Sequence, residues 1–353
     1  MKRYGNLYAE IWNIDNIREA HKNAQRGKKH YREVRMVNAD PEKYLLQVQA
    51  LLRDKTFRNS EYQVFTKIDS GKEREIYKLP YYPDRIIHHC VMQVLEPIWM
   101  RTFITDTYAA LKGRGIHKGV RRLKEALRDR ENTQYCLKFD VRKFYPSVDH
   151  DTLKAIIQRK VKDPEVLWLL DEVIDSAAGI PIGNYLSQYF GNLYLAYFDH
   201  WMKEVKRCRY YFRYCDDVVV LHSDKQFLHG LLDEVREYLS VNLKLSIKSD
   251  YQVFLVDVRG IDFLGYRFFH DYTLLRKSIA QRFKMKTLCV KREWWRLNVS
   301  QIVNSVMSYW GWIRHGNCLN LAKMYIDGTV RGHIARVCQK SKIRNPLRRL
   351  QWL

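Results

Sequence analysis

Two adjacent carboxylates, Asp216 and Asp217, lie between two apolar runs that favour β-strands, Tyr210 to Phe212 before them and Val218 to Leu221 after them. The pattern predicts a β-hairpin with the two acids at its tip. Two charges beside buried strands are costly unless a positive group neutralises them. Oxygen ligands alone select magnesium or manganese, so the hairpin is a candidate metal site. Asp also suits ordinary turns, and a polar turn without a metal is the alternative interpretation.

A second candidate carboxylate ends a separate predicted strand. Residues 134–141 alternate like a strand that ends at Asp140, and Asp149 follows as a candidate cap of the next helix. A lone Asp at a strand end is more often a cap or a turn residue. Two-metal phosphoryl transfer, however, needs carboxylates from separate elements that converge on ions about 4 Å apart. Asp140, Asp216 and Asp217 would supply that set.

The charge balance points to a polyanionic partner. The 353 residues include 62 Lys and Arg against 39 Asp and Glu, a formal net charge of +23. Nucleic acid is the leading explanation, and the many aromatic rings suit stacking on bases. A membrane surface is less favoured, because the basic residues are spread along the chain and no apolar run approaches membrane-spanning length. The seven Cys residues show no zinc-site spacing, so we expect a reduced, cytoplasmic protein without a membrane.

Turn signals and hydrophobic periodicity divide the rest of the chain into helices and hairpins, which indicates an α+β protein. We expect helices at 41–53, 85–99, 164–177 and 224–241, a long aromatic-rich helix that opens after a turn at 178–188 and runs to about 206, strands at 62–68, 74–79, 245–248 and 251–258, a Gly-bounded hairpin at 260–269, and basic helices from 275 onward. The basic residues 1–40 are a candidate nucleic-acid contact.

Five features follow one another in a set order: Asp140 at a strand end, the turn at 180–188, Tyr214-Cys215-Asp216-Asp217, a helix, and Phe263-Leu264-Gly265. From about residue 62 to residue 269 this order resembles the palm of a reverse transcriptase, whose hallmark is Tyr-x-Asp-Asp. The resemblance implies a right-hand polymerase fold whose palm has an antiparallel sheet that carries the hairpin. It implies a basic N-terminal extension and fingers at 1–130, a palm at 131–270 with finger helices inserted at about 149–207, and a helical basic thumb at 271–353.

The resemblance also implies a role for each matching residue. Asp140 and Asp216 would bind two Mg²⁺ ions, which Mn²⁺ can replace, with help from the Val141 carbonyl and with Asp217 as a more structural member of the catalytic set. Tyr145 matches the aromatic gate that fills the space of a ribonucleotide 2′-hydroxyl. The other implied sites are dNTP binding by Lys67, Lys72, Arg74, Tyr145, Ile182 and Gly183, a primer grip at Phe263, Leu264 and Gly265, and a general acid at Lys248, for which Lys244 is the competing candidate.

The turn before the long helix departs from most of the family. Intron and viral enzymes commonly have Gln-Gly-x-x-x-Ser-Pro there, whereas this chain has Ile182, Gly183, Ser187 and Gln188 at the corresponding positions. That form resembles the reverse transcriptases of diversity-generating retroelements, within the group II intron and retron-like bacterial branch. These enzymes copy a template RNA with errors at adenines. An aliphatic Ile182 lacks the hydrogen-bonding groups of Gln, which offers a physical reason for lower fidelity.

The implied activity is RNA-directed DNA synthesis that yields error-prone, adenine-mutagenic cDNA for diversification of a target gene. The implied partners are template RNA, primer, cDNA, dNTPs and a small, basic, helical and oligomeric accessory protein. A reverse transcriptase of a retron, a group II intron or a phage-defence system is the alternative. An RNA-dependent RNA polymerase is less favoured because of Tyr145, and a non-catalytic RNA-binding protein is less favoured because all three carboxylates are intact.

Overall fold

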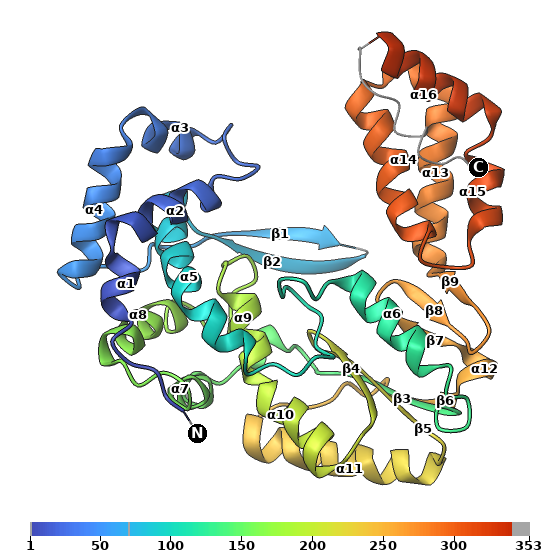
Figure 1. Cartoon of the computed structure of the whole chain (residues 1–353), viewed down its shortest axis with the longest axis horizontal. Coiled ribbons are helices and arrows are strands. Elements are labelled where there is room, and N and C mark those ends of the chain that lie inside the picture. The colour runs from blue at the N-terminus through green and yellow to red at the C-terminus, as the bar shows by residue number, and fades with distance from the viewer. Residues whose placement is uncertain (1, 70, 341–353) are drawn as a thin grey trace. The chain divides into compact units, whose positions relative to one another are not determined.

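The computed structural model describes residues 2–69 and 71–340. The chain, coloured from its N-terminus in blue to its C-terminus in red in Figure 1, forms two compact units. The first unit contains Met1–Gly115, Phe139–Val218 and His229–Tyr251, and the second contains Ile116–Lys138, Val219–Leu228 and Gln252–Leu353. Helices and strands both contribute, which confirms the predicted mixed class of fold. The predicted subdivision at residues 130 and 270 stays a prediction.

Four helices precede the first strand: α1 (Tyr8–Trp12), α2 (Ile14–Ala24), α3 (Arg32–Ala39) and α4 (Pro41–Arg53). Helix α4 has the predicted bounds, because Pro41 suits the first turn and the Asp40 side chain accepts the Lys43 N–H at 3.3 Å. We predicted no helix within residues 1–40, where the sequence analysis noted only basic charge. These short helices nevertheless bury apolar side chains, including Ile17 in α2 and Val34 in α3.

The predicted hairpin after α4 is confirmed. Strands β1 (Gln63–Asp69) and β2 (Lys72–Lys78) form a two-stranded antiparallel sheet, drawn as two blue arrows in Figure 1. The register places Gln63 opposite Lys78 and Lys67 opposite Arg74. A turn, η1 (Tyr81–Arg85), whose backbone is extended at Tyr82 with a φ of −114° and a ψ of 130°, then leads into α5 (Ile86–Met100), most of whose side chains are buried.

A four-stranded sheet has the order β4-β5-β3-β6. Its strands are β3 (Tyr135–Asp140), β4 (Tyr210–Tyr214), β5 (Asp217–His222) and β6 (Gln252–Leu255). The predicted acid-tipped hairpin is therefore β4 and β5, and the middle residues of both strands are buried. Because β3 is the neighbour of β5, the end of β3 lies beside the turn of this hairpin.

Two predicted strands are corrected. Residues 245–248 form no strand, because the Leu245 N–H bonds to the Leu239 carbonyl at the end of a helix and pairing is limited to a bridge between Val141 and Ile247. The strand predicted at 251–258 is β6 alone, since α12 (Val256–Arg259) begins directly after it.

The predicted long aromatic helix is also corrected, because it is interrupted. It consists of α9 (Ser187–Tyr194), α10 (Ala196–His200) and η3 (Trp201–Val205). The first break is at Leu195, whose φ and ψ of −95° and 0° depart from helical values. The other helical elements of this region are η2 (Tyr145–Ser147), α7 (His150–Gln158), α8 (Pro164–Ile174) and α11 (Lys225–Leu243).

The second unit contains α6 (Ile116–Ala126), a small antiparallel sheet and a group of helices. The sheet is β7 (Ile261–Phe263), β8 (Tyr266–Phe268) and β9 (Thr273–Leu275), which confirms the predicted Gly-bounded hairpin. The helices are α13 (Lys277–Glu293), η4 (Trp294–Arg296), α14 (Val299–Ile313), α15 (Leu319–Tyr325) and α16 (Gly328–Lys340). The basic stretch at 341–353 lies outside the described residues. No helix within the described ranges combines the length and apolarity needed to cross a bilayer.

Candidate active site

Asp140 and Asp216 meet where two neighbouring strands end. Asp140 is the last residue of β3. Asp216 lies in the turn between β4 and β5, and Asp217 is the first residue of β5. The N–H of Val141 donates to the carbonyl of Asp216 at 3.3 Å, so the backbone itself joins the two elements. Cys215 turns the chain with a φ of +53°, a left-handed value that is uncommon outside glycine.

The two carboxylates are close enough to repel each other. Burial, and then the charge of Asp140, raise the pKa of the Asp216 carboxyl, while the cations of Lys248 and Arg74 act to lower it. The Lys248 Nζ lies 3.6 Å from Asp140 Oδ2, and the Lys248 N–H donates to the Asp140 carbonyl at 2.9 Å. A bound cation would therefore relieve an unfavourable concentration of negative charge.

The donor set fits a hard divalent cation. Asp140 and Asp216 present only oxygen ligands, as magnesium and manganese prefer. Across residues 2–69 and 71–340, no group of three or more His, Cys, Asp or Glu side chains is arranged to hold a metal ion. The pair of Asp140 and Asp216 would therefore need backbone, water or substrate oxygens to complete the coordination shell of the ion. Magnesium commonly binds through one or two carboxylates in this way. The roles of Val141 and Asp217 as ligands stay predictions.

The two competing lysines have different surroundings. Lys248 contacts Asp140, whereas the Lys244 Nζ lies 2.7 Å from Asp149 Oδ2 at the start of α7. Hydrogen bonds from Lys244 and then Thr152 lower the pKa of Asp149 to about 2. Lys244 is therefore engaged in a helix cap, and the geometry favours Lys248 as the lysine of this site.

Tyr145 is held beside the hairpin by two close backbone approaches. A Cβ on Gly179 would lie 2.6 Å from the Tyr145 carbonyl oxygen, and a Cβ on Gly191 would lie 3.5 Å from the Tyr145 ring. The Tyr145 hydroxyl lies 3.7 Å from the Sγ of Cys215, next to Asp216. Burial raises the pKa of Tyr145 well above its usual range, so the phenol stays neutral. The ring is thus next to the carboxylates, and its role as a gate remains a prediction.

The turn at 182–188 is anchored to the β1–β2 hairpin. The Tyr77 N–H donates to the Ile182 carbonyl at 2.8 Å. Gly183 has a φ of +121°, and a Cβ there would lie 2.5 Å from the Tyr77 carbonyl oxygen, so this position requires glycine. Ser187 is buried and donates its hydroxyl to the Pro181 carbonyl at 2.6 Å, while Gln188 is exposed. Ser187 therefore has a structural task in this turn.

The predicted phosphate-binding cations lie on the exposed hairpin. Lys67 and Arg74 are directly opposed in the register and both are exposed. Because opposed residues project to the same face, they form a pair of cations. The charge of Arg74 reaches Asp216, which connects this face with the carboxylates. The side chain of Lys72, the third predicted cation, lies outside the described residues.

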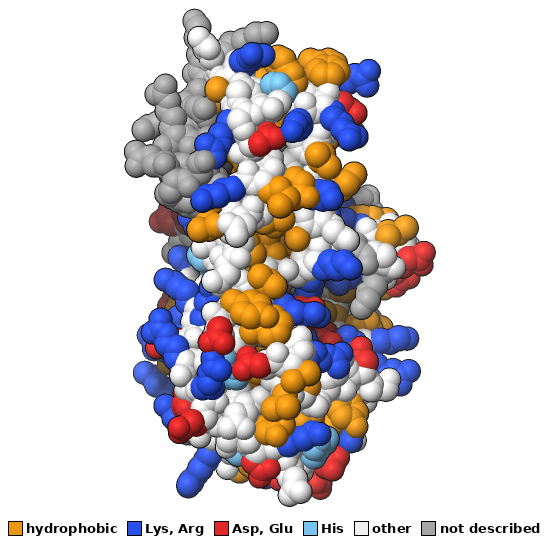
Figure 2. Space-filling view, turned by 90° about the vertical axis from the view of Figure 1, so that its right-hand side faces the viewer, with side chains coloured by type: hydrophobic (Ala, Val, Ile, Leu, Met, Phe, Trp, Pro, Cys, Tyr) orange, Lys and Arg blue, Asp and Glu red, His pale blue; other side chains and the backbone are white. Residues whose placement is uncertain are grey.

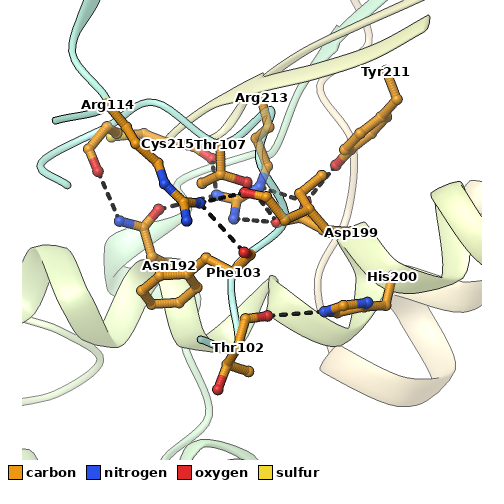
Figure 3. A network of polar contacts seen from close by, with 12 residues as sticks. Thr102, Phe103, Thr107, Arg114, Asn192, Asp199, His200, Tyr211, Arg213 and Cys215 are labelled. Atoms are coloured by element: carbon orange, nitrogen blue, oxygen red, sulfur yellow. Dashed lines mark hydrogen bonds and ion pairs between the residues drawn. The ribbon is translucent and has the colours of Figure 1, made fainter. Parts of the chain in front are cut away.

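A buried ion pair under the hairpin was missed by the sequence analysis. Arg213, with 0% of its side chain exposed, donates from Nε and Nη2 to the two carboxylate oxygens of Asp199 at 2.7 and 2.6 Å (Figure 3). Its Nη1 donates to the Cys215 carbonyl at 2.8 Å. Tyr211 and Thr107 donate to the same carboxylate at 2.6 and 3.0 Å. Burial acts to lower the pKa of Arg213, but Asp199 outweighs it and the net shift is upward.

This network fixes the turn that carries Asp216. Arg213 donates a hydrogen bond to the Cys215 carbonyl, and this carbonyl directly precedes Asp216 in the chain. A signal was present in the sequence, because an Arg inside an apolar strand must find a buried acidic partner. The sequence did not show that Asp199, in the aromatic helical segment, is that partner.

The residues predicted as a primer grip form the β7–β8 turn of the second unit. Phe263 and Leu264 are buried, and Leu264 and Gly265 have φ values of +51° and +81°. A Cβ on Gly265 would lie 2.6 Å from the Trp312 ring, so the turn packs directly on α14. Phe263 is fully buried, and the primer-grip role stays a prediction.

Basic side chains are spread widely over the surface. Figure 2 shows Lys and Arg side chains across the face it presents, interspersed with hydrophobic ones. This agrees with a net charge of +23 that is distributed along the chain. The distribution suits a long polyanion better than a single small anion.

The chain belongs to the reverse transcriptase (RNA-dependent DNA polymerase) family, whose model matches residues 65–268. The match includes Asp140, the turn at 182–188 and the Tyr214 to Asp217 hairpin. The predicted family is thereby confirmed.

Two curated relatives illustrate the position within the family. The chain is 25% identical over 250 residues to Protein YkfC of Escherichia coli (strain K12), covering 58% of this chain and 65% of YkfC. It is 24% identical over 151 residues to the group II intron-encoded protein LtrA of Lactococcus lactis subsp. cremoris, covering 40% of this chain and 24% of LtrA. The chain thus spans less than two thirds of either relative.

A solved structure supports the fold. The structure of apo telomerase from Candida Tropicalis aligns with a TM-score of 0.52 at 14% sequence identity, covering 81% of this chain and 59% of the telomerase chain. At this identity the likeness concerns the fold alone.

Proposed function

We propose that the chain is an RNA-directed DNA polymerase that extends a primer by nucleotidyl transfer at Asp140 and Asp216. The observation that carries the proposal is that Asp140, at the end of β3, lies close to Asp216, in the turn between β4 and β5, in a chain of the reverse transcriptase family. Asp217, at the start of β5, completes the acidic set.

Each step rests on a named side chain. Asp140 and Asp216, with the Val141 carbonyl, would hold Mg²⁺, which when bound lowers the pKa of the primer 3′-hydroxyl and offsets charge on the triphosphate. Lys67, Lys72 and Arg74 bind the triphosphate, with Arg74 presenting a planar fork to phosphate oxygens. Lys248, already against Asp140, holds the proton that the leaving pyrophosphate needs.

Selection of the sugar is assigned to Tyr145. Its hydroxyl lies beside the Cys215 Sγ, and its ring is backed by Gly191. A ring fixed from behind cannot retreat from a 2′-hydroxyl, so ribonucleotides are rejected by steric overlap. Phe263, Leu264 and Gly265 are assigned to the primer through the backbone of their turn.

The finer assignment is an enzyme of a diversity-generating retroelement, which makes adenine-mutagenic cDNA from a template RNA with the help of a small basic accessory protein. It rests on Ile182, Ser187 and Gln188. Gln at position 182 would offer an amide to the nucleotide or template, and Ile182 offers none. Replacing Ile182 with Gln should lower the error rate at template adenines in sequenced cDNA, and an unchanged rate would refute this explanation.

An intron-type reverse transcriptase is the second candidate, and the similarity to an intron-encoded protein favours it. Genomic context separates the two proposals. A nearby near-repeat whose copies differ at adenines supports the retroelement, whereas a flanking group II intron RNA supports the intron protein.

Primer extension tests the activity itself. The purified chain, given an RNA template with an annealed DNA primer, should incorporate labelled dNTPs with Mg²⁺, should stop on chelation, and should reject NTPs. A Tyr145→Ala variant should accept NTPs while its dNTP rate changes less. Absence of incorporation with any divalent metal would refute the proposal.

A further inference from the structure

The backbone of Gly179 and Ile180 lies directly against the backbone of the proposed gate residue. The Ile180 N–H donates to the Tyr145 carbonyl at 2.8 Å. Gly179 is buried with a φ of +62°, and a Cβ there would lie 2.6 Å from the carbonyl oxygens of both Tyr145 and Pro146. Because no side chain separates the two segments, a displacement of Gly179 would also displace Tyr145.

The side chain of His150 bonds this segment. His150 is the first residue of α7, and its side chain is 24% exposed. Its Nε2 lies 2.9 Å from the Gly179 carbonyl oxygen, and its Nδ1 lies 3.0 Å from Asp175 Oδ1. Both partners are acceptors, so the ring makes both hydrogen bonds when both of its nitrogens carry a proton. The carbonyl of the buried Gly179 thereby receives the partner that a buried carbonyl needs.

The second partner of the ring is itself held in place. Asp175 is the residue at which α8 ends. The Nζ of Lys154, on the same helix as His150, lies 2.6 Å from Asp175 Oδ2. His150 therefore joins the end of α8 to Gly179 across the short connection 176–178, which belongs to no helix or strand. One side chain thus fixes both ends of an irregular segment.

A histidine of the second unit is bonded in the same two-sided way. The Nδ1 of His270 lies 2.8 Å from Asp257 Oδ2, and its Nε2 lies 3.0 Å from Thr133 Oγ1. The arrangement by itself is therefore a means of joining two segments of the chain. His150 differs in what it joins, because its carbonyl partner lies against the backbone of Tyr145.

We propose that His150 is a positioning residue for Tyr145 and thereby sets how strictly the enzyme rejects ribonucleotides. Side chains that discriminate between substrates must be held to within about 0.5 Å by the contacts around them. The bond to Gly179 prevents the segment behind Tyr145 from moving away, so the ring keeps the space of a 2′-hydroxyl filled. A ring that can retreat lowers the barrier for the ribonucleotide alone. The inference rests on the proposed polymerase function and on Tyr145 as its gate.

The test uses the different lengths of the Asn and Gln side chains. In His150→Asn the amide can replace Nδ1 and bond Asp175, but it is too short to reach the Gly179 carbonyl. In His150→Gln the amide N–H can replace Nε2 and donate to that carbonyl. For each variant, kcat and KM are measured for incorporation of one dNTP and of the matching NTP on the same RNA template with a DNA primer.

His150→Asn should raise kcat/KM for the NTP about 10-fold, as the loss of one hydrogen bond predicts, while kcat/KM for the dNTP stays within about 3-fold. His150→Gln should restore most of the discrimination. Asp175→Ala removes the second partner of the ring at a side chain that is 51% exposed, and it should weaken discrimination in the same direction but by less. The matched control, His270→Asn, should discriminate as the wild type does.

Unchanged discrimination in His150→Asn would overturn the inference, and Asp175→Ala gives the same decision if the Asn variant does not fold. An equal fall of kcat/KM for both nucleotides would also overturn it, because that result shows a purely structural role. So would a His150→Gln variant that behaves like His150→Asn. Absence of dNTP incorporation by the wild type would instead refute the proposed function, and unchanged discrimination in Tyr145→Ala would refute the assignment of the gate.

Discussion

The two hairpins of the candidate site are built in opposite ways. The β4–β5 hairpin rests on the fully buried pair of Arg213 and Asp199, which also bonds the carbonyl before Asp216. The β1–β2 hairpin is a two-stranded sheet with exposed Val64, Phe65 and Ile68, and its cations face solvent. One hairpin is fixed from beneath, and the other has little core of its own.

The difference separates two tasks. Carboxylates that hold metal ions must keep their positions, because a small displacement costs catalytic rate. A group that binds each incoming substrate must admit and release it, which an exposed hairpin anchored at its base by Tyr77 and Ile182 permits. We therefore expect substitutions that affect the β4–β5 hairpin to change the stability of the protein, and substitutions in the β1–β2 hairpin to change substrate binding.

The largest expected effect is at the buried pair. Asp199→Asn leaves the Arg213 charge buried without its counter-ion, and such a loss costs about 3–5 kcal/mol. Urea denaturation measures the free energy of unfolding. The control is Asp233→Asn, which removes an exposed partner of Arg236 at 2.9 Å and should cost less than about 1 kcal/mol. Equal effects of the two substitutions would remove the distinction between the hairpins.

A smaller effect, on substrate binding alone, is expected at Lys67 and Arg74 of the β1–β2 hairpin. Arg74→Ala and Lys67→Ala each remove charge-assisted hydrogen bonds to the triphosphate and should raise the KM for dNTP about 10- to 100-fold. The free energy of unfolding should change by less than about 0.5 kcal/mol, because both side chains are exposed. Lys225→Ala, an exposed cation at the start of α11, serves as the control. A KM equal to that of the wild type would exclude these residues from the triphosphate site.

The smallest effect concerns the contact between Lys244 and Asp149. Hydrogen bonds from Lys244 and then Thr152 lower the pKa of Asp149 from 3.8 to about 2, so Lys244 accounts for part of the shift. A depressed carboxyl pKa stabilises the folded state above the unfolded pKa, and that stabilisation is lost as the pH falls from about 4 to about 2. Lys244→Ala should slightly lower the urea midpoint at pH 5, and the difference should shrink toward pH 2.5. A pH-independent difference would show that the contact is not electrostatic.

The sequence predicted the parts of the site that local patterns encode. Alternation and turn residues placed the β4–β5 hairpin, the β1–β2 hairpin and the strand end at Asp140. The cap at Asp149 and helix α4 were also predicted, since caps are local signals. The sequence could not show which lysine meets Asp140, because Lys244 and Lys248 are close in sequence and differ only in tertiary contacts.

Features that depend on distant residues were missed for a physical reason. The pair of Arg213 and Asp199 joins a strand to a separate helix, and the sequence of neither segment indicates which residue in the other is its partner. The break at Leu195 lies within an apolar pattern that a continuous helix would also satisfy. Helix α3 lies within a strongly basic stretch, where the charge obscured the apolar pattern formed by Val34 and Val37.

Asp216, fixed in place by its hairpin, is proposed to be essential for nucleotide incorporation. The direct measurement is the rate of Mg²⁺-dependent dNTP incorporation by Asp216→Asn on an RNA template, with RNA affinity measured alongside. Asn keeps the size of the side chain and removes its charge, so incorporation should fall by roughly 1,000-fold or more while RNA affinity stays within about 2-fold. Incorporation near the wild-type rate in the purified variant would contradict the account.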